Sequence, residues 1–251
     1  NDTALMKAWQ ERDFSTLARL AQPVFERLKH EYGIIQFSFY EADKTYFLRV
    51  HKPEWRGDVA DRFTLHAAEK SGEDAWGIES GPLSSLTLRC VRPRKEGEKI
   101  TGYIEVGMDT DRFAKELAQQ ADAEAMIVLR KEYSSQERFE KGKKVYGFSG
   151  SWETYPAWVV LSETLPGLSA IVGSWLAQKD LVAETKVFST KQGRKIFVCG
   201  IIPLWEPSGL DLARLILIRD ETDTSAVVRG GFLVRLFIFL LLLIGVLALL
   251  W

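Results

Sequence analysis

The chain has 251 residues, with 33 Lys and Arg residues, 34 Asp and Glu residues and a net charge of −1 at pH 7. This length suits one large domain or two small ones, and the balanced charge excludes the broad basic surface that nucleic-acid binding requires. Two cysteines, Cys90 and Cys199, are too few for a disulfide scaffold or a zinc module.

Residues 4–32 predict one long amphipathic helix. Its apolar positions recur at spacings of three and four, which gives a narrow stripe. The stripe consists of Phe14, Leu17, Ala21, Val24 and Leu28. Asp13 is suited to start a helical segment, Pro23 to kink it and Gly33 to end it. The stripe either packs on the helix's own domain or forms the seam of a dimer.

From Ile34 the pattern changes to that of strands. Two runs rich in aromatic and β-branched residues, 34–41 and 45–51, flank a polar turn and predict a hairpin. A polar loop with Pro53 and Gly57 follows, and then a helix from about Asp58 to Lys70. Further strands are expected at 76–80, 83–93 and 101–109, followed by a helix at 110–121.

The second half repeats this order in looser form. It predicts strands at 124–133, 155–163, 186–190, 194–204 and 213–220, with a short helix at 134–144. Residues 88–111 and 197–223 share a strand with a Cys, a Pro soon after it, a turn with Gly and an apolar strand that ends in Asp. We interpret the chain as two copies of one module in an α+β fold; the alternative is a chance likeness of two hairpins.

The C-terminal segment is apolar over 20 residues, Phe232 to Trp251, and its only charge is Arg235 near the start. A helix of this length spans about 30 Å, so the segment predicts a transmembrane helix, with a buried core helix as the alternative. Arg229 and Arg235 argue weakly against an outward-facing preceding chain. The chain starts at Asn1, so we expect further residues upstream.

The sequence contains no enzyme signature that we trust. Its three His residues are scattered, and it has neither a phosphate-binding loop nor a nucleophile elbow. We therefore expect no catalytic residue, no metal site and no cofactor.

A set of polar and aromatic residues in the first half is the candidate ligand site. It comprises Arg49, His51, Trp55, Asp58, Arg62, Trp76, Glu79, Arg89 and Tyr103. Arg49 and His51 lie two apart on a predicted strand, so they should share a face. Asp58 and Arg62 lie four apart on a predicted helix, so they should be neighbours. The alternative is that these charges form ordinary ion pairs.

The arginines of this set suggest a carboxylate ligand. Arg49, Arg62 and Arg89 offer planar forks that suit a carboxylate, and Asp58 and Glu79 suit a positive group. Together they favour an amino acid or another small polar molecule. Four aromatic residues are expected to wall the pocket or stack on a cation. These are Tyr40, Trp55, Trp76 and Tyr103.

The chain resembles a double Cache sensor domain, the tandem PAS-like extracellular module of bacterial receptors, and most of all the subtype on two-component sensor kinases and chemoreceptors. The matching text is FLRVHKPEWRGD at 47–58 with Arg62-Phe63-Thr64, then GIESG at 77–81, LRCVRP at 88–93 and GYIEVGMD at 102–109. The resemblance implies a helix at 1–33, a membrane-distal module at 34–122, a membrane-proximal module at 123–228 and a transmembrane helix at 229–251.

This resemblance also implies the function and the surroundings of the chain. Residues 1–228 are expected to be periplasmic or extracellular, on an inner-membrane receptor that is a homodimer and binds no nucleic acid. A first transmembrane helix would precede Asn1, and an output module of a chemoreceptor, histidine kinase or diguanylate cyclase would follow Trp251. The rival interpretations are a tail-anchored membrane enzyme and a structural membrane protein.

Overall fold

The computed structural model describes residues 3–178 and 184–222, which divide into two compact units. The first unit runs to Phe113 and includes Leu204–Leu212, and the second holds the remainder. Each contains an antiparallel five-stranded sheet, as the α+β prediction requires. No helix among the described residues is long and apolar enough to cross a membrane. The predicted transmembrane helix at 229–251 lies outside those residues.

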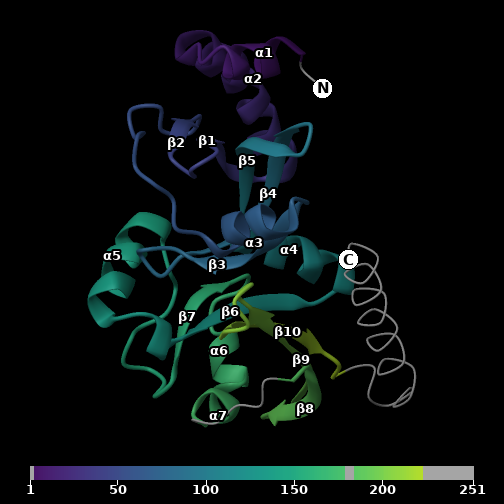
Figure 1. Cartoon of the computed structure of the whole chain (residues 1–251). Helices are drawn as coiled ribbons and strands as arrows, with labels where there is room; N and C mark the ends of the chain where they lie inside the picture. The colour runs from purple at the N-terminus through teal and green to yellow at the C-terminus, as the bar shows by residue number, and fades with distance from the viewer. Residues whose placement is uncertain (1–2, 179–183, 223–251) are drawn as a thin grey trace. The chain divides into compact units, whose positions relative to one another are not determined.

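The N-terminal segment forms two helices where one was predicted. Helix α1 spans Thr3–Gln10 and α2 spans Phe14–Tyr32, with Pro23 inside α2 (Figure 1). The chain breaks because Arg12 takes a left-handed backbone conformation and Asp13 then caps α2, its side chain accepting a hydrogen bond from the Thr16 amide. Gly33 ends α2 in the left-handed conformation, as predicted.

The apolar stripe of α2 packs on the first unit's own sheet. Leu17 and Ala21 are fully buried, and they share a core with Phe37 and Phe39 of the first strand. Phe14, Val24 and Leu28 lie partly buried against the same core. The stripe therefore belongs to this chain's own interior.

The first sheet is covered by helices on both faces. Its strands are β1 (Ile34–Glu41), β2 (Tyr46–Arg49), β3 (Ala75–Ser80), β4 (Leu86–Glu96) and β5 (Lys99–Asp109), in the order β2-β1-β5-β4-β3. Helices α1 and α2 cover one face. Helix α3 (Phe63–Ser71) covers the other through Leu65 and Ala68. This helix begins five residues later than predicted, and α4 (Thr110–Ala121) follows β5.

The second sheet has the same strand order. Its strands are β6 (Glu124–Arg130), β7 (Trp158–Glu163), β8 (Lys186–Gln192), β9 (Lys195–Trp205) and β10 (Asp211–Asp220), arranged β7-β6-β10-β9-β8. The shared order agrees with the interpretation of the sequence as a repeat. Helix α5 (Gln136–Tyr146) matches a prediction, whereas the single-turn helices α6 (Leu168–Ile171) and α7 (Gly173–Leu176) were not predicted.

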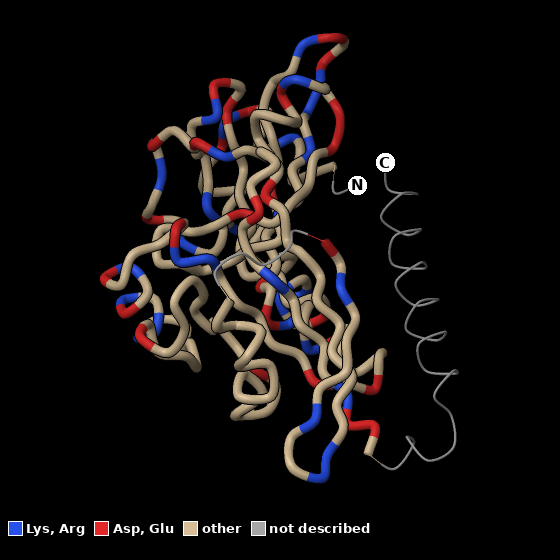
Figure 2. Tube along the Cα trace, turned by 90° about the horizontal axis from the view of Figure 1, so that it is seen from below, with Lys and Arg blue, Asp and Glu red and all other residues tan. Residues whose placement is uncertain are grey.

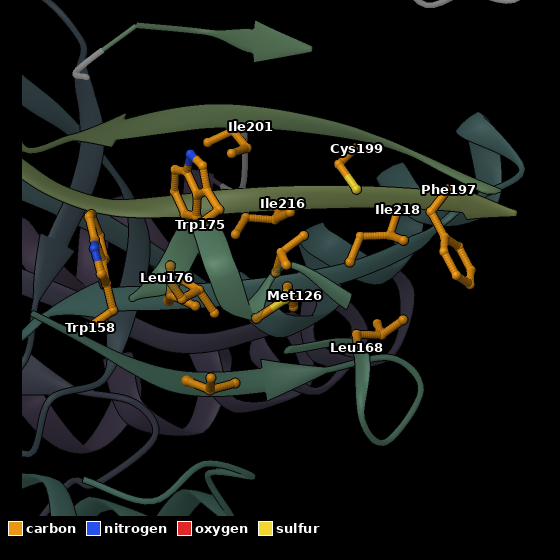
Figure 3. Close-up of a cluster of buried hydrophobic side chains, with 13 residues drawn as sticks. Met126, Trp158, Leu168, Trp175, Leu176, Phe197, Cys199, Ile201, Ile216 and Ile218 are labelled. Atoms are coloured by element: carbon orange, nitrogen blue, oxygen red, sulfur yellow. The ribbon is translucent and has the colours of Figure 1, made fainter. Parts of the chain in front are cut away.

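The face of the second sheet beneath α6 and α7 is an apolar core. Leu168 of α6 and Trp175 and Leu176 of α7 pack on strand residues such as Met126 and Cys199 (Figure 3). Burial raises the pKa of Cys199 to about 12, so its thiol remains protonated at neutral pH. This position is therefore structural, as a small apolar side chain would be.

Candidate functional site

The face of the first sheet beneath α3 is lined by polar side chains. In the strand register Glu105 lies opposite both Ser38 and Val91, and Arg89 lies opposite Gly77 and Gly107, so these positions share one face. The polar members are nearly all buried. They are Ser38, Tyr40, Glu79, Thr87, Arg89, Tyr103 and Glu105, with Thr64 of α3 above them.

Arg89 is the centre of this polar cluster. Its Nη1 donates to Glu105 Oε1 at 2.7 Å and to Gln36 Oε1 at 2.6 Å, and its Nε lies 3.8 Å from Glu79 Oε2. Arg89 is 2 % exposed and Glu105 is 1 % exposed. Within the described residues, Arg89 Nε and Glu105 Oε2 have no hydrogen-bond partner. Buried polar atoms rarely stay unsatisfied, so this arrangement suits an additional polar group.

Glu79 joins strand β3 to the start of α3. Its Oε1 accepts hydrogen bonds from the Thr64 amide at 2.8 Å and from the Thr64 hydroxyl at 2.7 Å. The residue at the helix N-cap, Arg62, makes no side-chain capping bond, so Glu79 satisfies an amide that would otherwise lack a partner. A carboxylate at a helix N-terminus is also favoured by the helix dipole.

Arg49 holds the loop that follows β2. Its guanidinium forms two bonds of 2.7 Å to Asp58, donates to the Trp55 carbonyl at 2.7 Å and lies 3.2 Å from the centre of the Tyr46 ring. The bonds from Arg49 lower the pKa of Asp58, which is therefore an anion at neutral pH. Asp58 thus pairs with Arg49. The predicted Asp58–Arg62 helical pair is wrong, because α3 begins only at Phe63.

Arg62 is a half-buried cation beside the polar cluster. Burial lowers its pKa, but the neighbouring Tyr46, Glu105 and Glu79 outweigh that effect, and the net pKa is raised. It forms no salt bridge within 3–178 and 184–222. Burial, and then Glu105, raise the pKa of Tyr40 well above its usual value, so its phenol stays protonated.

Three predicted site residues lie away from the polar cluster. Strand β2 ends at Arg49, and His51 turns to the other face, with its ring 6.3 Å from that of Phe25 in α2. The prediction that Arg49 and His51 share a face is therefore wrong. Trp55 is 59 % exposed beneath Lys52, and Trp76 is 38 % exposed on β3, beside the inward-facing Gly77.

Sequence reasoning missed several members of the cluster. Gln36 and Ser38 precede Tyr40 at every second position of β1, and Glu105 follows Tyr103 at the same interval on β5. This alternation was the signal that could have found them, because residues two apart on a strand share a face. Among the described residues, no group of three or more His, Cys, Asp or Glu side chains could hold a metal ion.

The corresponding face of the second unit has a different composition. Trp158 is fully buried there, stacked 6.0 Å from Trp175, with the guanidinium groups of Arg130 and Arg214 at 4.8 and 5.2 Å from its ring. The other side chains of that core are apolar. The network of buried acidic, basic and hydroxyl groups described above lies in the first unit.

Several solved structures are similar to this chain. The sensor domain of the *Vibrio cholerae* histidine kinase DctB shares 11% identity over 86% of this chain and 84% of its own, with a TM-score of 0.44. The periplasmic domain of *Vibrio cholerae* LuxQ shares 15% over 88% and 87%, with a TM-score of 0.47. The ligand-binding domain of *Pseudomonas aeruginosa* PctB in complex with L-Arg shares 13% over 86% and 86%, with a TM-score of 0.43.

No curated protein matches the chain. A family model does: the double sensory domain of two-component sensor kinase matches residues 1–149, which is more than half of the 251 residues. The match covers both N-terminal helices, the whole first sheet and the start of the second. The resemblance to double Cache sensor domains is therefore confirmed, and the chain belongs to the double Cache family of sensory domains found on two-component sensor kinases.

Proposed function

We propose that this chain is the extracytoplasmic sensory region of a bacterial transmembrane receptor and that its first unit binds a small polar ligand beneath α3. The receptor would be a chemoreceptor, a sensor histidine kinase or a diguanylate cyclase. Family membership supports the sensory role. The apolar segment at 232–251 supports a membrane anchor at 229–251, with residues 1–228 periplasmic or extracellular. We further propose a homodimer, which gives the receptor two sensory regions, and no nucleic-acid partner.

The observation that carries the ligand proposal is the unsatisfied buried pair. Arg89 Nε and Glu105 Oε2 are a donor and an acceptor that lack hydrogen-bond partners among the described residues, although Arg89 Nε lies 3.8 Å from the Glu79 carboxylate. Both lie on one face of one sheet. Leaving such atoms unmatched costs about 1–3 kcal/mol each, and more for charged groups. A ligand with both a donor and an acceptor would form hydrogen bonds with these two atoms. Such binding would explain why the fold keeps two atoms that destabilise it when no ligand is bound.

The charges around this pair favour a carboxylate that also carries a positive group. Arg62 has no salt bridge within the described chain and lies close enough to Glu79 and Glu105 for their charges to act on it. A ligand carboxylate would contact Arg62 and Arg89, and an ammonium group would contact Glu105. Arg49 is committed to Asp58, so its role is to hold the loop beside the site.

The two sensory modules would then be residues 34–122, distal to the membrane, and 123–228, proximal to it. The different composition of the two faces supports a division of labour. The first module would bind the ligand, and the second module, with its apolar core, would connect the first to the membrane segment.

Titration calorimetry tests the ligand proposal. The complete chain in a mild detergent would be titrated with a panel of amino acids and small organic acids. Arg62→Gln removes a guanidinium next to the site. Arg92→Gln is the matched control, because the Arg92 side chain is exposed and pairs with Asp74. Losing an anchor in a buried site costs about 2–5 kcal/mol, so we expect at least about 30-fold weaker binding for Arg62→Gln.

Two results would contradict this proposal. If a panel member binds the parent and both variants equally, the site lies elsewhere. If no panel member binds the parent, the carboxylate assignment is wrong.

A further inference from the structure

The turn between β8 and β9 is strongly basic. Lys191, Arg194 and Lys195 are all exposed, and the two strands close at the Gln192–Lys195 pair. Gly193 has a φ of +62°, which lets the chain reverse tightly. We call residues 191–195 the basic turn; its Lys and Arg residues are drawn in blue in Figure 2.

Three interactions fix the basic turn beside the last described residues of the second unit. Lys195 Nζ lies 2.9 Å from Asp220 Oδ2. The Ile196 amide donates to the Thr222 hydroxyl at 3.1 Å, and its carbonyl accepts from the Glu221 amide at 2.8 Å. Because β9 and β10 are neighbours, the start of β9 and the end of β10 lie at the same end of the sheet. The last described residue, Thr222, therefore lies beside the basic turn.

The turn keeps an excess of positive charge. Asp220 balances Lys195, and the Thr222 hydroxyl, followed by Lys195, lowers the pKa of Asp220 to about 2. Arg219 is paired with Asp122 and Glu221. Lys191 and Arg194 form no ion pair in the part of the chain that the structure describes. Two cations thus remain directed at solvent where the chain leaves the sheet.

We propose that the basic turn binds the anionic headgroups of the membrane into which residues 232–251 insert. This inference rests on the proposed membrane anchoring. Only nine residues, 223–231, separate Thr222 from the apolar segment, and fully extended they reach at most about 30 Å. The turn is therefore tethered close to a lipid surface, and its unpaired charges match anionic headgroups. Binding there orients the second sheet against the membrane.

The expected strength follows from general membrane electrostatics. Each Lys or Arg near an anionic surface contributes about a fivefold preference, which falls off within a Debye length. Removing both unpaired cations should therefore lower the surface-bound population by about 30-fold. Molar salt should have a similar effect on the parent.

A depth measurement on the complete chain tests this inference. The chain would be reconstituted into vesicles of phosphatidylcholine alone or of phosphatidylcholine mixed with phosphatidylglycerol. A nitroxide at Gln192→Cys, in a Cys90→Ala background, reports the distance of the turn from a lipid-attached nickel chelate. The matched control carries the label at Ser208→Cys, in the exposed turn at the other end of β9. Flotation with the vesicles measures membrane insertion separately.

The inference predicts that the label at residue 192 approaches the lipid only in the phosphatidylglycerol vesicles, and that Lys191→Gln with Arg194→Gln abolishes the approach. The label at 208 should not respond. If the chain floats with both vesicles and the label at 192 is indifferent to lipid charge, the basic turn does not bind headgroups, although the anchoring stands. If the chain floats with neither, the anchoring itself fails, and this inference fails with it.

Discussion

Arg89 and Glu105 form a buried ion pair. What this pair contributes to folding stability differs from what it would contribute to ligand binding. Taking two charges out of water costs several kcal/mol per ion, so such a pair often contributes little more than an apolar pair of the same size. Gln36 accepts a hydrogen bond from the Arg89 guanidinium. Arg89 Nε and Glu105 Oε2 still lack hydrogen-bond partners within the described chain. Conformational stability alone does not explain this geometry, and the proposed ligand binding would explain it.

Removal of one partner should be costly. Glu105→Gln leaves Arg89 charged and buried without the one carboxylate to which it is hydrogen-bonded, so we expect the free energy of unfolding to fall by about 3–5 kcal/mol. Glu96→Gln is the control, because Glu96 lies in an exposed pair with Arg94 and should change stability by less than about 1 kcal/mol. Urea unfolding followed by circular dichroism measures both. Equal losses of stability in the two variants would show that breaking the buried pair costs no more than breaking the exposed one.

His51 should make the protein sensitive to mild acid. Burial lowers its pKa to about 4, while in the unfolded chain it returns to about 6.5. The unfolded state therefore binds the proton first, and stability is lost as pH falls from about 6.5 to about 4, with no further loss from this group below that. Partial exposure reduces the effect to about 1–3 kcal/mol.

The comparison of two histidine variants isolates this contribution. His51→Gln should lose less stability between pH 7 and pH 5 than the parent, as measured by urea unfolding at each pH. His66→Gln, at an exposed site beside Asp61, should retain the parent's dependence. An unchanged pH dependence in His51→Gln would show that its imidazole is solvated in the folded state.

At the scale of single residues, the sequence indicated which residues lie in the cluster better than it indicated which residues pair with each other. Arg89 and Glu79 were identified as site residues, and the structure brings them together. Asp58 was assigned to Arg62 because the helix was placed too early, and the exact start of a helix depends on caps such as Glu79 that come from distant strands. Glu105 was overlooked because a lone acid in a strand has no local signal beyond the alternation of its neighbours.

The strands and most helices could be predicted from their periodicity. Runs rich in aromatic and β-branched residues, bounded by polar turns, located the ten strands of the described chain to within a few residues. The break between α1 and α2 was missed because the apolar stripe was followed only from Phe14 onwards. The last buried residue of α1, Trp9, lies five positions before Phe14, so the spacing of three and four does not continue across the break. Helices α6 and α7 have four residues each, and a single turn is too short to show a helical period.

The end of α2 offers a prediction about an element. Gly33 has a φ of +67°, and a Cβ there would lie 2.0 Å from Cδ of Arg112, whose guanidinium donates to the Glu31 carbonyl at 2.9 Å. Gly33→Ala should therefore combine backbone strain with displacement of Arg112. We expect a loss of about 2–3 kcal/mol, of which about 1–2 kcal/mol is the strain alone.

Gly97→Ala is the matched control for this prediction. Gly97 has a φ of +62° in the turn between β4 and β5, and a Cβ there meets nothing within 4 Å. It should show the strain without the crowding, as measured by thermal or urea unfolding. If Arg112→Ala does not reduce the difference between the two glycine variants, crowding at Arg112 is not its cause.

The two units share one strand order but differ in the polarity of the side chains in their interiors. Both sheets follow the same order, and in both the helical segments of one face lie between the second and third strands. The repeat in the sequence could reveal this plan, because it depends on the order of elements. The contrast between a polar and an apolar interior depends on which side of each strand faces α3 or α6 and α7, and sequence reasoning did not resolve that.

Each unit has its own core, so each should open independently, and Cys199 reports on the second. Its thiol is fully buried, with a pKa of about 12, whereas Cys90 is exposed. A disulfide reagent should therefore label Cys90 quickly and Cys199 only after local opening. Met126→Ala truncates a buried neighbour of Cys199 at a cost of about 2–5 kcal/mol and should accelerate its labelling by at least about 30-fold.

The matched variant is Leu65→Ala, which truncates an equally buried side chain in the core of the first unit. If the units open separately, it should leave the labelling rate of Cys199 unchanged while it lowers the stability of the first unit. Labelling is followed by absorbance in a Cys90→Ala background, so only one thiol contributes. Equal acceleration by Leu65→Ala would mean that the two units open as one cooperative body, and a ligand beneath α3 would then stabilise both.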